Sequence, residues 1–166
     1  MTIDAFLVGS DLLRVPYGHV PVIREVRVRS VNLNWRGPTL TLRVDLASFP
    51  DAEVAPQEWV DAGMDTVQCQ LEFLAVEDLA LARWSPPVVA VVEAVPWGER
   101  RRMRVRVGGE GLDLEFSSSD SVVVRHVSAF KGREDGADGG RHLFVSRVDA
   151  RRHTSLPGTD EKTYFA

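Results

Sequence analysis

The chain has 166 residues, of which 44% are hydrophobic and 27% are charged, and its formal net charge is −4 at pH 7. That length suffices for one domain that buries roughly 70% of the surface exposed by its unfolded chain. No apolar run approaches the roughly 18 residues of a membrane span. The N-terminal apolar stretch is broken by Gly9, Ser10 and Asp11, unlike a signal peptide. We therefore expect a cytoplasmic protein without membrane contact.

Cysteine usage and codon bias add two further expectations. Cys69 is the only cysteine, so no intrachain disulfide can form. It shares the apolar phase of a predicted strand with Val67 and Leu71, where a free thiol packs as a small hydrophobe. Nearly all basic residues are Arg, and Val and Ala are abundant. Because their codons are GC-rich, the source is expected to be a high-GC bacterium such as an actinobacterium.

The first predicted element is a short helix over Ile3–Arg14, and a β-hairpin follows it. The hairpin turns at residues 35–38, where Gly37 and Pro38 favour turn geometry. Its second strand alternates apolar and polar residues from Thr39 to Leu46, as expected when one face is buried. Counting outward from the turn gives the apolar pairs Leu33–Leu40 and Val31–Leu42.

The first strand of this hairpin changes phase upstream, because its apolar residues there are Val26 and Val28. One extra residue at Arg29–Ser30, opposite Arg43, restores the alternation. We therefore predict a β-bulge at that point. Beyond it the predicted pairs are Val28–Val44 and Val26–Leu46.

A second hairpin is predicted from the strands Arg102–Val107 and Leu112–Ser117, with Gly108–Gly111 as the loop. This loop gives the inward pairs Val107–Leu112, Val105–Leu114 and Met103–Phe116, and the outward pairs Arg106–Asp113 and Arg104–Glu115. Opposite charges facing each other across a hairpin contribute roughly 0.2–1 kcal/mol each. These pairs explain the basic run ERRRMRVR without nucleic-acid binding.

Further strands are predicted at Thr66–Val76, Val88–Val95, Ser121–Ala129 and His142–Val148. The almost continuously apolar Val88–Val95 is expected to be a central strand covered on both faces. Pro56–Ala62, followed by Gly63, is expected to form one helical turn.

About eight strands with little helix predict a mainly β protein. The expected architecture is an antiparallel β-sandwich or a partly open barrel, with a short N-terminal helix and one helical turn. We expect one β-rich domain over residues 1–149. Residues 150–166 are expected to be a tail that either packs back or stays flexible.

Catalytic motifs are not found, and we expect no enzyme activity, cofactor or metal site. No metal-ligand spacing such as HExxH occurs among the four histidines: His19, His126, His142 and His153. Asp135 and Asp138, in the Gly-rich stretch Lys131–Arg141, either hold a cation or belong to a solvated turn, and the turn is favoured.

Four tryptophans remain: Trp35, Trp59, Trp84 and Trp97. Aromatic residues at strand ends either form a platform for a ligand such as a sugar or seal the rim of a β core. Rim packing is favoured, because burying a large aromatic side chain is strongly stabilising. Trp59 lies on the predicted helical turn, from which it would dock against the sheet.

Three runs in order, GPTLTLRVDLASFP, PQEWVDAGMDTVQCQLEF and LAVEDLALARWS, resemble the immunity protein 50 family of bacterial polymorphic toxin systems. The resemblance covers about Gly18 to Ala129. It rests on the acidic strand end before Phe49–Pro50, the Pro56-x-x-Trp59-x-x-x-Gly63 pattern and the closing Trp84–Ser85. The family pattern favours Asn-Thr where this chain has Asp65–Thr66, a mild departure that does not affect the expected fold. The resemblance implies a non-catalytic inhibitor that binds a toxin, and it identifies neither the toxin nor the binding residues.

Charge is segregated along the chain. Residues 44–82 contain no Lys or Arg and nine acids: Asp45, Asp51, Glu53, Glu58, Asp61, Asp65, Glu72, Glu77 and Asp78. Such segregation creates a local field that steers a basic partner. Alternatively, these acids solvate a loop and a strand face and pair with arginines elsewhere.

The leading hypothesis is an immunity protein that neutralises a basic toxin, for instance a nuclease, and contacts neither nucleic acid nor membrane. Its candidate partner-binding residues are Asp51, Glu53, Glu58, Asp61, Asp65, Trp35 and Trp97. The alternative is a small-molecule or carbohydrate-binding β module that uses Trp35 or Trp97 as a platform. The oligomeric state is left open.

Overall fold

The computed structural model describes residues 2–152, so the predicted tail lies outside the described residues from position 153 onward. The elements in chain order are the 3₁₀ helix η1 (Ile3–Phe6), β1 (Leu7–Val8), α1 (Asp11–Tyr17), β2 (Glu25–Asn34), β3 (Thr39–Leu46), α2 (Gln57–Asp61), β4 (Thr66–Phe73), β5 (Glu77–Trp84), β6 (Val88–Pro96), β7 (Arg102–Gly109), β8 (Leu112–Ser119), β9 (Val122–Phe130), β10 (Leu143–Phe144) and α3 (Arg147–Arg152). Over the described stretch, no helix combines the length and the apolar character needed to cross a membrane.

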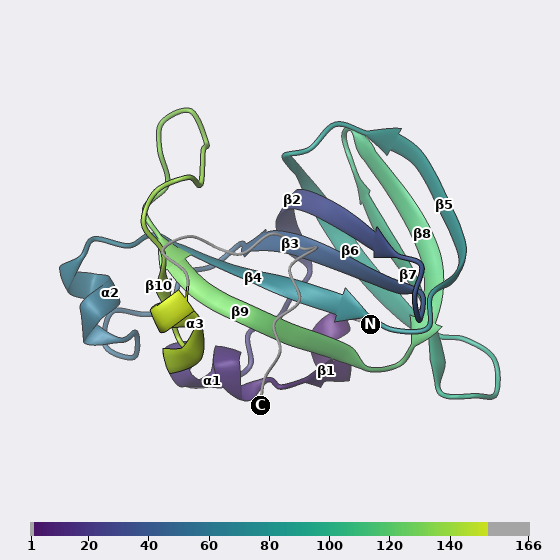
Figure 1. Cartoon of the computed structure of the whole chain (residues 1–166), viewed down its shortest axis with the longest axis horizontal. Helices are drawn as coiled ribbons and strands as arrows, with labels where there is room; N and C mark the ends of the chain where they lie inside the picture. Colours follow the sequence, from purple (N-terminus) through teal and green to yellow (C-terminus); the bar gives the residue numbers. More distant parts are fainter. Residues whose placement is uncertain (1, 153–166) are drawn as a thin grey trace.

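The ten strands of residues 2–152 belong to one sheet, in the order β1-β9-β4-β3-β2-β6-β7-β8-β5, with β10 also paired to β9. Its pairings are antiparallel except that of β1 with β9. The sheet curves strongly but does not close into a barrel (Figure 1). The predicted mainly β fold with short helices is therefore confirmed, with ten strands where about eight were expected.

The core lies on the inner face of this curved sheet. Phe73 on β4 and Phe116 on β8 meet edge to face there, with ring centroids 5.0 Å apart, and neither side chain is exposed. The N-terminal segment supplies the covering layer, because Ile3, Leu13 and Tyr17 are buried in the same cluster. Figure 1 shows this segment beside β4 and β9, away from β5 and β8.

The first hairpin has the predicted register. The pairs Val31–Leu42 and Leu33–Leu40 lie near the turn, and Val28–Val44 and Val26–Leu46 lie beyond an irregularity between Val28 and Ser30. The predicted bulge is thus confirmed, and Arg29 is its extra residue. The bulge keeps Val26 and Val28 on the buried face together with the alternating residues of β3.

The predicted register of the second hairpin is wrong by two residues, although its faces are right. Val107 pairs with Leu114, and Val105 pairs with Phe116. Gly109 pairs directly with Leu112, so Glu110 and Gly111 form a two-residue turn in which Gly111 has φ +102°.

The ion pairs predicted for this hairpin form nevertheless, along diagonals. Arg104 Nε lies 3.2 Å from Glu115 Oε1, and Arg106 Nε lies 4.0 Å from Asp113 Oδ1. Long side chains reach diagonal neighbours across a hairpin. The charge pattern was therefore compatible with both registers and did not decide between them.

Gly109 explains why the hairpin is longer than predicted. It is a strand residue that pairs with Ala90 of β6, and a Cβ placed on it would lie 2.3 Å from the carbonyl oxygen of Val89. Only glycine permits so close an approach of two backbones. Gly109 is therefore a strand residue at a close contact between β7 and β6, whereas the sequence pattern placed it in the hairpin loop.

Several other predicted boundaries are corrected. The single helix Ile3–Arg14 is split into η1, β1 and α1, with Gly9 at φ +77° in the break. The predicted strand His142–Val148 is reduced to β10 and continues into α3. β6 is central in the sheet but covered on one face only, because Val89 and Val95 are 45% and 49% exposed. Strand β5 was not predicted.

Two predicted elements agree with the structure. In β4 the side chains of Val67, Cys69, Leu71 and Phe73 are buried as expected. The predicted helical turn is α2, which begins after Pro56 and is followed by Gly63 at φ +69°.

Candidate functional site

The acidic segment around helix α2 is anchored to the body of the protein by one tryptophan. Trp59 is 2% exposed, and its ring centroid lies 6.1 Å from that of Phe49. Ahead of the helix, the Asp51 carbonyl accepts hydrogen bonds from the N–H groups of Val54 and Ala55, at 2.9 and 2.8 Å. These contacts fix the segment against the sheet and leave its charged side chains on the surface.

Five exposed carboxylates of this segment form what we call the acidic α2 region: Asp51, Glu53, Glu58, Asp61 and Asp65. Asp61 Oδ1 accepts a hydrogen bond from Gln57 Nε2 at 2.7 Å, and Asp65 Oδ1 accepts one from the backbone N–H of Gly132 at 2.8 Å. The segment between β3 and β4 that carries these acids lies, with α2, at one end of the molecule (Figure 1).

Three of the nine acids between residues 44 and 82 are neutralised by arginines from outside that stretch. Their closest N–O distances are 2.5 Å for Asp45–Arg29, 3.2 Å for Glu72–Arg125 and 3.7 Å for Glu77–Arg102. Within residues 2–152, no ion pair joins a Lys, Arg or His side chain to the acidic α2 region. Pairing with distant arginines thus accounts for these three acids, and the acidic α2 region presents its charge to solvent.

The two candidate tryptophans lie elsewhere. Trp35, in the β2–β3 turn, is 80% exposed, and Trp97, after β6, is 53% exposed. An arginine guanidinium lies over each ring, Arg36 at 5.1 Å and Arg104 at 5.9 Å. In Figure 1 the β2–β3 turn and the β6–β7 connection lie toward the end opposite α2. The structure therefore does not join these tryptophans to the acidic α2 region in one site.

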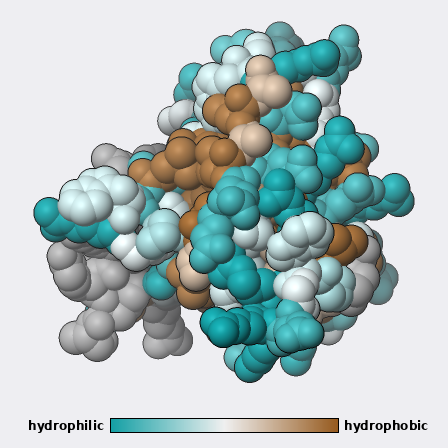
Figure 2. Space-filling view, turned by 90° about the vertical axis from the view of Figure 1, so that its right-hand side faces the viewer, coloured by the Kyte–Doolittle hydropathy of each residue, from teal (hydrophilic) through white to brown (hydrophobic). Residues whose placement is uncertain are grey.

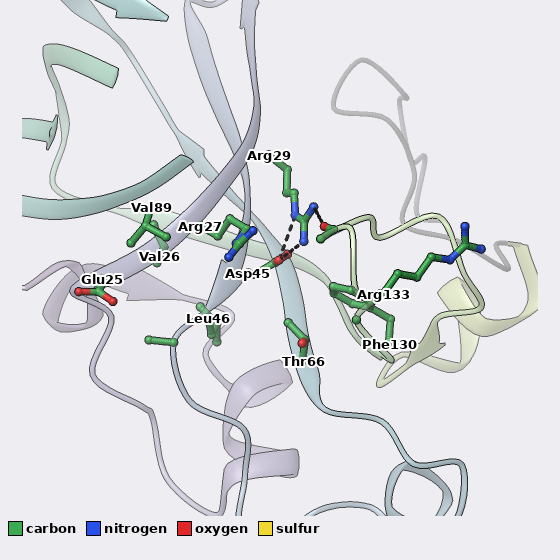
Figure 3. A pocket seen from close by; sticks show the side chains of 13 residues that line it. Glu25, Val26, Arg27, Arg29, Asp45, Leu46, Thr66, Val89, Phe130 and Arg133 are labelled. Carbon is green, nitrogen blue, oxygen red and sulfur yellow. Dashed lines mark hydrogen bonds and ion pairs between the residues drawn. The ribbon is translucent and has the colours of Figure 1, made fainter. Parts of the chain in front are cut away.

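A cleft of about 350 Å³ lies near the acidic α2 region, between the sheet and the stretch 131–141 (Figure 3). Arg29 donates to Asp45 from Nε and Nη2, and its Nη1 donates to the carbonyl of Gly136 at 2.6 Å. Gln68 Nε2 donates to both Asp45 Oδ1 and Asp138 Oδ2 at 2.7 Å. This network fastens the 131–141 stretch to the face of the sheet opposite the core.

The ionisable groups of this network form hydrogen bonds and ion pairs within it. Burial alone would raise the pKa of Asp138, but the hydrogen bond from Gln68 and the charges of Arg43 and Arg29 outweigh it and lower that pKa. Burial lowers the pKa of His142, whose Nε2 donates to the Asp138 carbonyl at 2.8 Å. Such an arrangement stabilises a loop and supplies no free acid or base.

The candidate cation site is explained by the same contacts. Asp138 binds Gln68 and lies 3.5 Å from Arg43, while Asp135 accepts a hydrogen bond from the N–H of Ala137 at 2.9 Å. In the described part of the chain, no group of three or more His, Cys, Asp and Glu side chains could hold a metal. Cys69 is buried, and its burial, with the nearby charge of Asp45, raises the pKa of the thiol to about 12. It is a core residue.

Comparison with known families identifies the chain. The family model of immunity protein 50 matches residues 9–128, close to the stretch from Gly18 to Ala129 that carries the resemblance. The chain therefore belongs to the immunity protein 50 family. Neither the curated proteins nor the solved structures contain a match.

The sequence did not indicate the buried network. Gln68 and Gln70 alternate with the apolar residues of β4, and that alternation gave no sign of their burial, yet they are 0% and 4% exposed. The signal that was available is the choice of two uncharged amides where a solvated strand usually carries charged side chains. The stretch 131–141, which covers part of this face, lies beyond the family match.

Proposed function

We propose that this protein binds and neutralises a bacterial toxin through the acidic α2 region, without a catalytic step. The observation that carries the proposal is the set of five exposed carboxylates, held together by a buried Trp59 anchor and free of ion pairs among residues 2–152. Membership of the immunity protein 50 family supports a toxin partner in general.

The chemistry of the surface favours a basic partner. Like charges held together on one surface raise the local potential, and a partner of opposite sign is attracted before contact. Toxins that cleave nucleic acids are of this kind, because they bind phosphate with Lys and Arg. In this proposal the protein acts in the cytoplasm, against a toxin of a polymorphic system encoded beside it.

Co-expression with the toxin domain of the neighbouring gene tests the proposal. The variant Asp51→Lys/Glu53→Lys/Asp61→Lys is expected to lose protection while keeping its melting temperature, because exposed substitutions change stability by only about 0.5 kcal/mol. Full protection by the folded triple variant would contradict the proposal.

A matched control separates position from net charge. The variant Glu93→Lys/Glu99→Lys/Glu110→Lys makes the same change in net charge at exposed positions of β6 and of the turns flanking β7. It is expected to protect like the unmodified protein. If both triple variants lose protection equally, overall charge is responsible and the acidic α2 region is not the binding surface.

A carbohydrate-binding module is the second candidate, and the exposure of Trp35 and Trp97 is the observation that favours it. Aromatic rings stack on sugar faces, but an arginine already lies over each of these two rings. Binding on a glycan panel that is lost in Trp35→Ala or Trp97→Ala, together with no protection against the toxin, would favour this candidate.

A further inference from the structure

The most exposed large hydrophobic side chain among residues 2–152 borders an apolar hollow. Trp35 is 80% exposed, and beside it lies a hollow of about 250 Å³. We call this the Trp35 groove, after its apolar lining residues Leu33, Trp35, Pro38, Val76 and Leu79. Leu33 and Leu79 are 56% and 37% exposed. A cluster of large exposed apolar side chains marks an interaction surface.

The two walls of the groove are fixed relative to each other. The β2–β3 turn forms one wall and the start of β5 forms the other, and the N–H of Val76 donates to the carbonyl of Pro38 at 2.8 Å. Figure 2 views the molecule from this end and shows brown hydrophobic surface framed by teal hydrophilic surface. The groove is therefore preformed, and an occupant does not have to open it.

Strand β5 is the last strand of the sheet, but its shape disfavours the addition of a partner strand. Its pairing with β8 carries two register irregularities, and Asp78 has φ +54°. Bulges of this kind blunt a sheet edge against strand addition. Recognition at this end therefore rests on side chains, chiefly Trp35 and the apolar walls of its groove.

The charges beside the groove are complementary to each other. The Arg36 guanidinium lies on the Trp35 ring, and Asp78 is exposed on the opposite wall. Among residues 2–152, neither Arg36 nor Asp78 takes part in an ion pair. Glu77, the other acid in the lining, lies 3.7 Å from Arg102, so Asp78 is the acid of the groove without an ion pair among residues 2–152. A protruding ring, a hollow and unpaired charges of both signs on one surface meet the requirement for a self-complementary contact under a two-fold rotation.

We propose that the occupant of the Trp35 groove is a second copy of this chain. In the two-fold dimer, Trp35 of each copy enters the groove of the other, and Arg36 of each copy reaches Asp78 of the other. The acidic α2 regions lie at the far ends of the molecule, where like charges are separated and remain accessible. This inference is independent of the toxin and extends beyond the proposed function.

Sedimentation of the purified protein across a concentration series is the test. The expected result is a reversible monomer–dimer equilibrium whose dissociation constant rises about 30-fold in Trp35→Ala, the change equivalent to about 2 kcal/mol for an interface aromatic. Trp97→Ala is the matched control, because it also removes an exposed tryptophan that carries an arginine on its ring. It is expected to leave the equilibrium unchanged.

A double-mutant cycle tests the charge contact. Arg36→Gln and Asp78→Asn are each expected to weaken the dimer about threefold, and the double variant is expected to be no weaker than either single variant. Asn suits position 78, because it tolerates a positive φ.

Three results would overturn the proposal. The first is a monomer at every concentration, and the second is a dimer unaffected by Trp35→Ala. The third is a monomeric protein in which Trp35→Ala abolishes binding to the neighbouring-gene toxin or to a glycan, since the groove would then have that other occupant. The first two results do not bear on toxin binding. Loss of toxin binding in Trp35→Ala would place a toxin contact at this groove, and the charge-reversal variants decide separately whether the acidic α2 region binds the toxin.

Discussion

Arg29 and Asp45 form a buried ion pair on the face of the sheet opposite the core, with the Nε–Oδ2 distance at 2.9 Å and both side chains less than 10% exposed. Arg29 is the extra residue of the β2 bulge, and Asp45 lies on the neighbouring strand β3. The bulge that keeps Val26 and Val28 in the core therefore also supplies the arginine that binds the 131–141 stretch through Gly136.

Breaking this pair from one side is expected to be costly. Arg29→Met leaves the Asp45 carboxylate buried without its cation, and we expect the free energy of unfolding to fall by about 3 kcal/mol. Urea unfolding followed by circular dichroism measures this change. Replacing both partners, in Arg29→Met/Asp45→Leu, removes the buried charge and is expected to be more stable than the single variant.

The control for this prediction is an exposed ion pair. Arg106→Met removes the partner of Asp113, at 4.0 Å on the surface, and is expected to change stability by about 0.5 kcal/mol or less. A loss in Arg29→Met no larger than that in Arg106→Met would mean that the buried pair does not stabilise the fold.

His142 is expected to make stability depend on pH. Its surroundings suit the neutral imidazole: Nε2 donates to the Asp138 carbonyl, and Nδ1 accepts from the Ser128 hydroxyl, both at 2.8 Å. Burial lowers its pKa below the ordinary value of 6.5, so the unfolded chain binds the proton more readily. Stability is therefore full above pH 6.5 and falls as the pH drops from there through the lowered pKa.

Unfolding at about pH 7.5 and at about pH 5 measures this dependence. His142→Gln is expected to be less stable at the higher pH, because the ring stacks on Phe130 at 4.9 Å, but to lose less on acidification. His19→Gln, at an exposed position, should keep the dependence of the unmodified protein. Equal pH dependence in all three proteins would show that His142 titrates normally in the folded state.

The close approach of β6 and β7 predicts different tolerance at two adjacent glycines. An alanine Cβ at Gly109 meets the Val89 carbonyl at 2.3 Å, whereas one at Gly108 meets only the flexible end of Arg106 at 3.6 Å. We expect Gly109→Ala to cost about 1–3 kcal/mol, as for other overpacked sites. Gly108→Ala should be close to neutral in the same thermal unfolding experiment, and the opposite order would contradict the observed register.

Local patterns determined the first hairpin because apolar residues alternate along both of its strands, and most of them are buried. The phase change between Val28 and Val31 has one economical explanation, a single extra residue, and the structure has that bulge. In the second hairpin both registers bury the same residues. The choice between them depends on the contact of Gly109 with β6, which no local pattern reveals.

Strand β5 and the burial of the glutamines were not predicted, because both depend on contacts between segments that are distant in the sequence. Irregular pairing breaks the alternation of β5, and all eight of its residues are exposed. Gln68 is buried by a stretch that lies some seventy residues further along the chain, through its contact with Asp138. By contrast, the exposure of Asp51, Glu53 and Asp61 was foreseeable, since a polar loop before a strand normally lies on the surface.

The association rate constant for the neighbouring-gene toxin domain, measured by stopped flow at low and high salt, tests toxin binding by the acidic α2 region most directly. The unmodified protein should associate at least about tenfold more slowly at 1 M than at 0.1 M salt, because the screening length falls from about 10 Å to about 3 Å. Asp51→Lys/Glu53→Lys/Asp61→Lys should associate slowly at both concentrations. A triple variant that associates as fast as the unmodified protein, with the same salt dependence, would contradict binding through this surface.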